Sequence, residues 1–121
     1  MKCLDTFPLI EIAIGNEKAA SLLDHDIIIT DITISEFYYV ILQKYNAATS
    51  DFWYKKFAPY CASVPRDVLI KAVRFRHINK KKEFSFFDCV GYIFATENKY
   101  EFVTGGKEFE GFRSVSIIKK L

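Results

Sequence analysis

Short apolar runs recur along the chain, separated by segments in which apolar residues have a helical spacing. The run Ile27–Ile29 is β-branched and lies between Asp26 and Asp31, which is typical of a strand buried on both faces. By the same criteria, strands are expected at residues 1–4, 27–30, 62–64, 101–104 and 114–118.

The segments between these runs have apolar residues at every third or fourth position, which predicts amphipathic helices. The clearest one begins at Thr33 and has Glu36 in its first turn. Its apolar face is formed by Ile34, Phe37, Tyr38, Ile41 and Tyr45. Other helices are expected around Pro8 to residue 13, at 17–23, from a Thr49/Ser50 cap to Pro59, at 67–80 and from Ser85 onward.

This alternation predicts an α/β fold that forms one domain over residues 1–121. Strands joined through helices form right-handed crossovers, so we expect a central, mainly parallel sheet of four to five strands with helices on both faces, a three-layer α/β/α sandwich. Sites in such sheets form at the carboxyl ends of the strands, where the strand order reverses. Asp5, Thr30 and Thr104 should therefore lie along one edge of the sheet.

Composition narrows the class of protein but not its activity. At 121 residues, half of them apolar, the chain is long enough to bury a core without disulfides or structural metals. A formal net charge of +2 is too small to indicate a nucleic-acid binder by itself. Any attraction to phosphate must therefore come from local clusters of basic residues.

The cysteines and the apolar runs bear on the compartment. Cys3, Cys61 and Cys89 are odd in number and widely spaced, which fits reduced thiols better than disulfides or a structural zinc site. Asp5 and Glu11 interrupt what would have to be the apolar core of a signal peptide, and no apolar run is long enough to span a bilayer. We expect a soluble, cytoplasmic protein without a membrane partner.

Three carboxylates stand near the expected edge of the sheet. Asp5 follows the first strand, Glu36 lies early in the helix after the second, and Asp88 opens the helix that leads to the strand at 101–104. Mg²⁺ and Mn²⁺ prefer oxygen ligands, and such a metal can activate a water and neutralise charge during in-line hydrolysis of a phosphodiester. The three acids are therefore candidate metal-binding and catalytic residues.

Helix capping is the alternative explanation for the same acids. Thr33 with Glu36, and Ser85 with Asp88, fit the capping-box spacing, in which an acid satisfies free amides of the first helical turn. Asp5 fits the cap of the helix that follows it. The spacing alone leaves both interpretations open.

Three segments of the sequence resemble PIN domains, and specifically the VapC-type toxins of prokaryotic type II toxin–antitoxin pairs. They are LDTFPLIEIAIGN, ITISEFYYVIL and SFFDCVGYIFATENKYEFVTGGKEFEGF, so the resemblance extends over nearly the whole chain. It implies a parallel α/β/α sandwich and an endoribonuclease that cuts RNA with Mg²⁺ or Mn²⁺ held by three or four acids. It also implies a homodimer and a small VapB-like antitoxin as partner. The resemblance assigns the first three acids to Asp5, Glu36 and Asp88, and assigns supporting hydroxyl positions to Thr6 and Thr104.

The chain departs from the family pattern at two positions. Phe7 stands where family members usually have Asn or Ser. Gly106 stands where the fourth acid is expected, two residues after Thr104. The pair Gly105–Gly106 fits an ordinary turn. Against the family pattern, Gly106 indicates a degenerate site, an introduced change, or a three-acid site completed by Glu108 or water.

The sequence therefore predicts a metal-dependent endoribonuclease with weakened activity. The alternative is a catalytically degenerate PIN-like module that binds RNA or an antitoxin. A phosphoacceptor or nucleotide-binding α/β domain is less well supported, because no glycine-rich phosphate-binding motif follows a strand.

Two further features bear on partners. Lys80, Lys81 and Lys82 precede the helix that carries Asp88, and the stripe before them is formed by Lys71, Arg74, His77 and Lys81. Such a positive rim would hold an RNA backbone, although an ordinary solvated helix face has the same pattern. The aromatic residues of two helices exceed what one buried face needs, which leaves core filling and a protein interface open. They are Tyr38, Tyr39, Phe52, Trp53, Tyr54 and Phe57.

Overall fold

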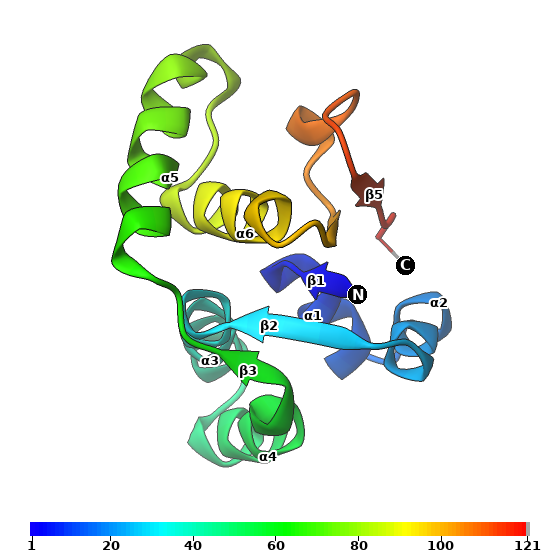
Figure 1. The fold of residues 1–121 in the computed structure, drawn as a ribbon. Coiled ribbons are helices and arrows are strands. Elements are labelled where there is room, and N and C mark those ends of the chain that lie inside the picture. The colour runs from blue at the N-terminus through cyan, green and yellow to red at the C-terminus, as the bar shows by residue number, and fades with distance from the viewer. Residues whose placement is uncertain (121) are drawn as a thin grey trace.

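The computed structural model describes residues 1–120 and contains a five-stranded parallel sheet with the strand order β3-β2-β1-β4-β5 (Figure 1). The strands are β1 (Lys2–Leu4), β2 (Ile27–Thr30), β3 (Cys61–Ala62), β4 (Glu101–Thr104) and β5 (Val115–Ile117). The chain adds β2 and β3 on one side of β1 and then returns to add β4 and β5 on the other. The strand order therefore reverses between β1 and β4.

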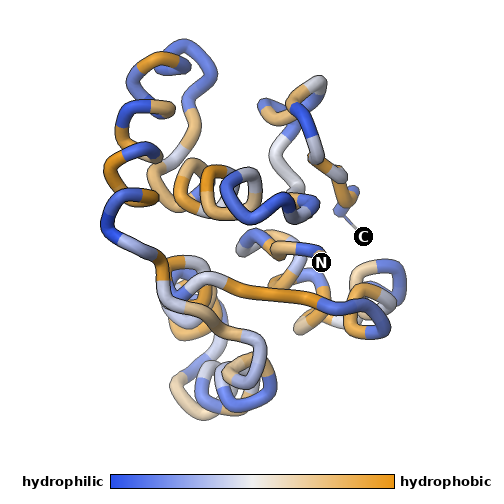
Figure 2. The backbone as a smooth tube through the Cα atoms, in the orientation of Figure 1, coloured by the Kyte–Doolittle hydropathy of each residue, from blue (hydrophilic) through white to orange (hydrophobic). Residues whose placement is uncertain are grey.

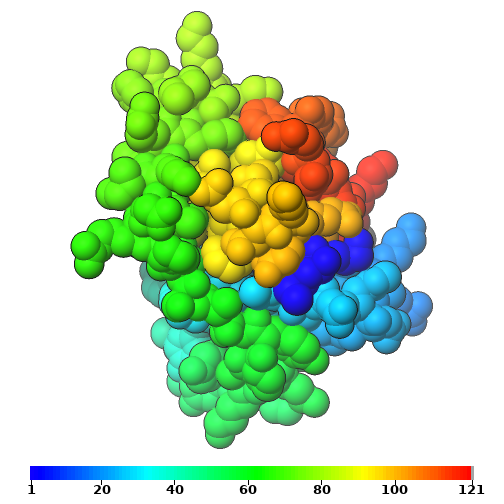
Figure 3. All heavy atoms as spheres, viewed as in Figure 1, coloured from blue at the N-terminus to red at the C-terminus, as the bar shows by residue number. Residues whose placement is uncertain are grey.

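Helices cover both faces of this sheet, which confirms the predicted three-layer α/β/α arrangement. The helices are α1 (Thr6–Ala13), α2 (Glu17–Ala20), α3 (Asp31–Lys44), α4 (Ala47–Phe57), α5 (Arg66–Ile78) and α6 (Phe86–Glu97). Short 3-10 helices follow three of them, η1 (Ser21–Asp24), η2 (Ala58–Tyr60) and η3 (Lys80–Lys82), and η4 (Lys107–Phe109) follows β4. In the space-filling view, α6 lies between α5 and the C-terminal segment (Figure 3).

The sheet separates two hydrophobic cores. Cys3 and Leu4 are both fully buried but belong to different cores, because successive strand residues point to opposite faces. Leu4 packs with buried residues of α1 and α3 such as Leu9 and Phe37. Cys3 packs with α6 and the aromatic cluster of the C-terminal segment. Figure 2 shows β2 as a hydrophobic strand between these layers, and burial of each large apolar side chain contributes about 1.5–3 kcal/mol.

The start of α3 differs from the prediction. The helix begins at Asp31, with Thr30 as its N-cap, and the Thr30 hydroxyl accepts a hydrogen bond from the Thr33 amide at 3.0 Å. Because Thr30 ends β2 and caps the helix at once, the strand leads into α3 without a loop. Glu36 therefore lies beyond the first turn, and the predicted pairing of Thr33 with Glu36 in a capping box is wrong.

Other boundaries shift by a few residues. The cap of α4 is Asn46, whose side chain accepts a hydrogen bond from the Thr49 amide, so the helix starts before the predicted Thr49/Ser50 cap. The strand predicted at 62–64 is the shorter β3, one residue earlier, and α5 ends at Ile78, before the lysine run. The cysteines are free thiols. Within residues 1–120, no helix is both long and apolar enough to cross a lipid bilayer.

Candidate active site

The carboxyl ends of β1 and β4 place Asp5 beside Thr104. The two strands pair in parallel, and the Asp5 amide continues the ladder by donating to the Val103 carbonyl at 2.9 Å. The Thr104 hydroxyl donates to Asp5 Oδ2 at 2.8 Å and itself accepts from the Gly106 amide at 3.1 Å. This chain of bonds ties the turn after β4 to the end of β1, at the point where the strand order reverses.

Glu36 reaches the same edge through α1. The Thr6 hydroxyl, next to Asp5, donates a hydrogen bond to Glu36 Oε1. Thr6 begins α1, and α1 packs against α3, which carries Glu36. The supporting roles predicted for Thr6 and Thr104 stay predictions, but each hydroxyl contacts one of the candidate acids directly.

Asp88 lies in the first turn of α6, where it completes a capping box. The Ser85 amide donates to Asp88 Oδ2, and the Asp88 amide donates to Ser85 Oγ, both at 3.1 Å. The capping interpretation is therefore confirmed for Asp88 and wrong for Glu36. It is also wrong for Asp5, which stands at the N-cap of α1 but makes no side-chain capping bond. Capping uses one oxygen of Asp88, and a carboxylate has a second one to offer a ligand.

The three carboxylates repel one another. Burial and then the charge of Asp88 raise the pKa of Asp5 to about 7, with a smaller contribution from Glu36, while the Thr104 hydroxyl and the Thr6 backbone amide oppose the rise. Burial also raises the pKa of Glu36, helped by Asp88 and opposed by the Thr6 hydroxyl. Like charges with raised pKa values at one sheet edge are typical of functional sites and suit a bound cation.

The donor set fits a hard divalent cation. Asp5 is 4% exposed, and its Oδ1 is buried without a hydrogen-bond partner. Buried polar atoms are nearly always paired, so this oxygen is available to a ligand. Within residues 1–120, no three side chains of His, Cys, Asp and Glu are already arranged to hold a metal ion. The carboxylates of Asp5, Glu36 and Asp88 would therefore have to draw together around one.

The turn at Gly106 has room for a side chain. A Cβ there would lie 3.5 Å from Thr104 Oγ1 and 3.0 Å from Glu108 Oε2, which belongs to a flexible, exposed side chain. The backbone φ of −78° suits any residue. Glu108 thus occupies part of the space that a larger residue at Gly106 would use, and nothing in the backbone requires glycine at this position.

Gly105 is different, because Phe7 fills the space above it. A Cβ at Gly105 would lie 2.3 Å from Phe7 Cδ2, closer than any real contact. The aromatic residue at Phe7 and the absence of a side chain at Gly105 are therefore two parts of one packing arrangement.

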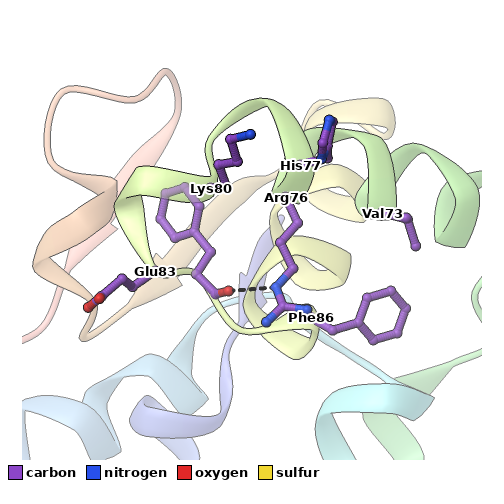
Figure 4. A pocket seen from close by; sticks show the side chains of 7 residues that line it. Val73, Arg76, His77, Lys80, Glu83 and Phe86 are labelled. Carbon is purple, nitrogen blue, oxygen red and sulfur yellow. Dashed lines mark hydrogen bonds between the residues drawn. The ribbon is translucent and has the colours of Figure 1, made fainter.

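The basic residues divide into those that line a pocket and those that do not. Lys71 forms an ion pair with Glu97, Lys82 lies over the Phe112 ring, and Arg74 and Lys81 are exposed elsewhere on the surface. A pocket of about 620 Å³ at the end of α5 is lined by Val73, Arg76, His77, Lys80, Glu83, Phe84 and Phe86 (Figure 4). Among the lysines of the predicted rim, only Lys80 lines this pocket.

Arg76 and Phe86 were not among the site residues predicted from the sequence. The positions Val73, Arg76, His77 and Lys80 have the spacing i, i+3, i+4, i+7 of a single helix face, whereas the predicted stripe drifts around the helix. The buried positions Val68 and Ala72 fix which face of α5 meets the core. Combining the two patterns would have identified the pocket face.

The fold matches those of solved structures over most of the chain. A chain of a toxin–antitoxin complex from Klebsiella pneumoniae matches with a TM-score of 0.78 and 17% identity, covering 99% of this chain and 100% of that one. VapC20 of Mycobacterium tuberculosis, a sarcin–ricin loop cleaving toxin, matches with a TM-score of 0.73 and 12% identity, covering 84% and 85%. FitAcB from Neisseria gonorrhoeae matches with a TM-score of 0.65 and 17% identity, covering 95% and 96%.

These similarities confirm the PIN-like fold that the sequence resemblance predicted. No protein-family model matches the chain, and no curated protein does either. At identities of 12–17%, the likeness extends to the fold. Any function must be argued from the site itself.

Proposed function

We propose that this protein is an endoribonuclease of VapC type, which hydrolyses RNA phosphodiester bonds with Mg²⁺ or Mn²⁺ held by Asp5, Glu36 and Asp88. The observation that carries the proposal is the unpaired, buried oxygen of Asp5, next to two further carboxylates that repel it. Its position at the reversal of strand order, in a PIN-like fold, supports the same conclusion.

The side chains around the acids position them. Thr104 holds Oδ2 of Asp5, so the orientation of this carboxylate is set and Oδ1 is left free. The Thr6 hydroxyl holds Oε1 of Glu36 by a hydrogen bond, and the Ser85 amide holds Oδ2 of Asp88. A bound Mg²⁺ or Mn²⁺ would supply a water of lowered pKa and neutralise charge on the phosphodiester. No side chain of the site is required to form a covalent intermediate with RNA.

The proposed partners follow from this assignment. We infer a VapB-like antitoxin, because this fold also occurs in a toxin–antitoxin complex. We also infer that the protein forms a homodimer, as the family resemblance implies. We infer a cytoplasmic location, because a toxin of this type would meet RNA and its antitoxin there. A second candidate function is a degenerate module that binds RNA or an antitoxin without cutting, and Gly106 is the observation that favours it.

Restoring an acid at position 106 tests the function. Gly106→Asp would place a carboxylate beside Thr104 and Asp5, because a Cβ there is 3.5 Å from Thr104 Oγ1. We expect Mn²⁺-dependent cleavage of labelled RNA to be weak in the unaltered protein and about 10- to 100-fold faster in Gly106→Asp, the range measured for lost carboxylate support around metals. Gly106→Asn, of equal size but neutral, is the matched control and should gain no activity.

Metal binding provides an independent measurement. We expect Mn²⁺ to raise the melting temperature of the unaltered protein with increasing concentration, as a ligand of the folded state does. Asp5→Asn should abolish that increase. If neither the unaltered protein nor Gly106→Asp cuts RNA, the nuclease function is refuted. An absent melting shift as well would support the degenerate binding module.

A further inference from the structure

The pocket at the end of α5 combines cationic and aromatic side chains. Arg76, His77 and Lys80 line it together with Val73, Phe84 and Phe86 (Figure 4). Its volume of about 620 Å³ falls in the range of small-ligand sites. Neither Arg76 nor Lys80 forms an ion pair with a carboxylate anywhere in residues 1–120, so both charges are available to a ligand.

Arg76 is held in place by the backbone rather than by an acid. Its Nε donates to the Phe84 carbonyl at 2.8 Å, which leaves the terminal nitrogens of the guanidinium to contact a ligand. Phe84 is buried and stacks on Phe75 and Phe109, so this anchor point is rigid. A guanidinium fixed in this way is suited to a phosphate or to stacking on a base.

The pocket lies next to the candidate acids. Phe86 is the first residue of α6 and Asp88 the third. A helix turns by about 100° per residue, so these two side chains leave the first turn of α6 on opposite sides. The pocket and Asp88 therefore meet at the first turn of α6. A polynucleotide chain that passes the N-terminus of α6 would meet both.

We propose that this pocket binds one nucleotide of single-stranded RNA next to the phosphodiester held at the acids. Arg76 and Lys80 contact its phosphate, and its base packs against Phe86. Aromatic faces beside cations are the usual recognition surface for unpaired bases. Glu83 also lines the pocket, and its charge opposes phosphate and carboxylate alike. The ring of Phe86 favours a nucleotide over an acidic peptide, because a base can stack on it. The inference rests on the proposed function and extends it to the substrate contacts.

Two neighbouring lysines provide a matched test. Lys80 lines the pocket, while Lys81 carries the same charge one residue later and lies outside it. Binding is measured by fluorescence anisotropy with a labelled single-stranded oligoribonucleotide in EDTA, so that no metal or cleavage is needed. Lys80→Ala should weaken binding by about three- to tenfold and reduce the salt slope by about 0.7, the value for one phosphate contact on a single strand. Lys81→Ala should change neither.

The aromatic contact and the rival ligand are tested in the same assay. Phe86→Leu keeps an apolar side chain but removes the ring, and it should weaken RNA binding several-fold with little change in the salt slope. Equal effects of Lys80→Ala and Lys81→Ala on binding would refute a specific site in the pocket and would indicate a diffuse electrostatic attraction between RNA and the basic surface. If polyglutamate displaced the labelled RNA as effectively as unlabelled RNA does, the proposed nucleotide site would be refuted, and an acidic peptide would be the better ligand. Failure here with intact Mn²⁺-dependent cleavage would refute the subsite alone.

Discussion

The Asp5 carboxylate is buried, and one of its oxygens has no hydrogen-bond partner. Its pKa of about 7 in the folded protein stands well above the ordinary value of 3.8. The folded protein therefore binds this proton more tightly than the unfolded chain does. Below about pH 4 both forms are protonated, and between there and pH 7 the folded protein loses stability as the pH rises.

Replacing the Asp5 carboxylate with a neutral amide should restore the stability that the folded protein loses as the pH rises. Without metal, Asp5→Asn should raise the melting temperature by several degrees at pH 8.5, where Asp5 is ionised, and by much less at pH 5, where it is protonated. The amide oxygen of asparagine can still accept the Thr104 hydroxyl. Thermal unfolding in EDTA at both pH values measures the effect. Glu110→Gln, at an exposed carboxylate, is the control, and an equal gain at both pH values would contradict the assigned pKa.

Single residues also show how far sequence reasoning extends to the site. Asp5 was predictable because it ends a short apolar strand, and Ser85 with Asp88 because a capping box is a local pattern. The bond from Thr6 to Glu36 was not, since it joins residues 30 positions apart whose contact depends on how α1 packs against α3. The free oxygen of Asp5 depends on tertiary structure in the same way.

At the scale of elements, α1 contacts the turn after β4 beside the candidate site. Phe7, in the first turn of α1, covers Gly105, whose Cβ would lie 2.3 Å from the ring. Phe7 is one of the two positions at which the sequence departs from the family pattern that it resembles. The glycine and the phenylalanine should therefore be energetically coupled.

A double-mutant cycle tests this coupling. Gly105→Ala alone should destabilise the protein by about 1–3 kcal/mol, because the methyl group overpacks the ring. In the background of Phe7→Ser the same change should cost much less, giving a coupling of at least about 1 kcal/mol. Urea unfolding of the four proteins measures it. Equal costs of Gly105→Ala in both backgrounds would show that the turn adjusts without the ring.

Element boundaries were predicted best where the signal is local. Ser85 marks the start of α6 correctly, and the run Ile27–Thr30 coincides with β2. The start of α3 was placed too late because Thr30 serves both as the last residue of β2 and as the cap of the helix. On α5, the basic face was misjudged because the stripe was drawn from the charged positions alone, without the apolar positions Val68 and Ala72 that face the core.

On the scale of the whole molecule, the parallel sheet was predictable from the alternation of strands and helices. The predicted shared edge is confirmed, since parallel pairing of β1 with β2 and β4 aligns the ends of all three strands. The strand order itself did not follow from the sequence pattern. It is set by which helix packs on which face, and it places the reversal at Asp5 and Thr104.

Part of the aromatic surface of α3 and α4 stays exposed to solvent in the single chain. Of the six residues noted in the sequence, Phe57 is buried in the core, whereas Tyr39 is 56% and Phe52 is 53% exposed. Core filling therefore accounts for only part of this aromatic surface. Exposed aromatic residues are enriched at protein interfaces, which supports the proposed homodimer.

Light scattering of the purified protein tests this dimer. We expect twice the mass of one chain at high concentration, with dissociation on dilution. Tyr39→Glu and Phe52→Glu, made separately, should shift the protein toward the monomer, because each places a charge within an apolar contact. Ile78→Glu changes a side chain that is 75% exposed on α5, and it should leave the mass unchanged. A monomer at all concentrations, or an equal effect of Ile78→Glu, would exclude an interface formed by α3 and α4.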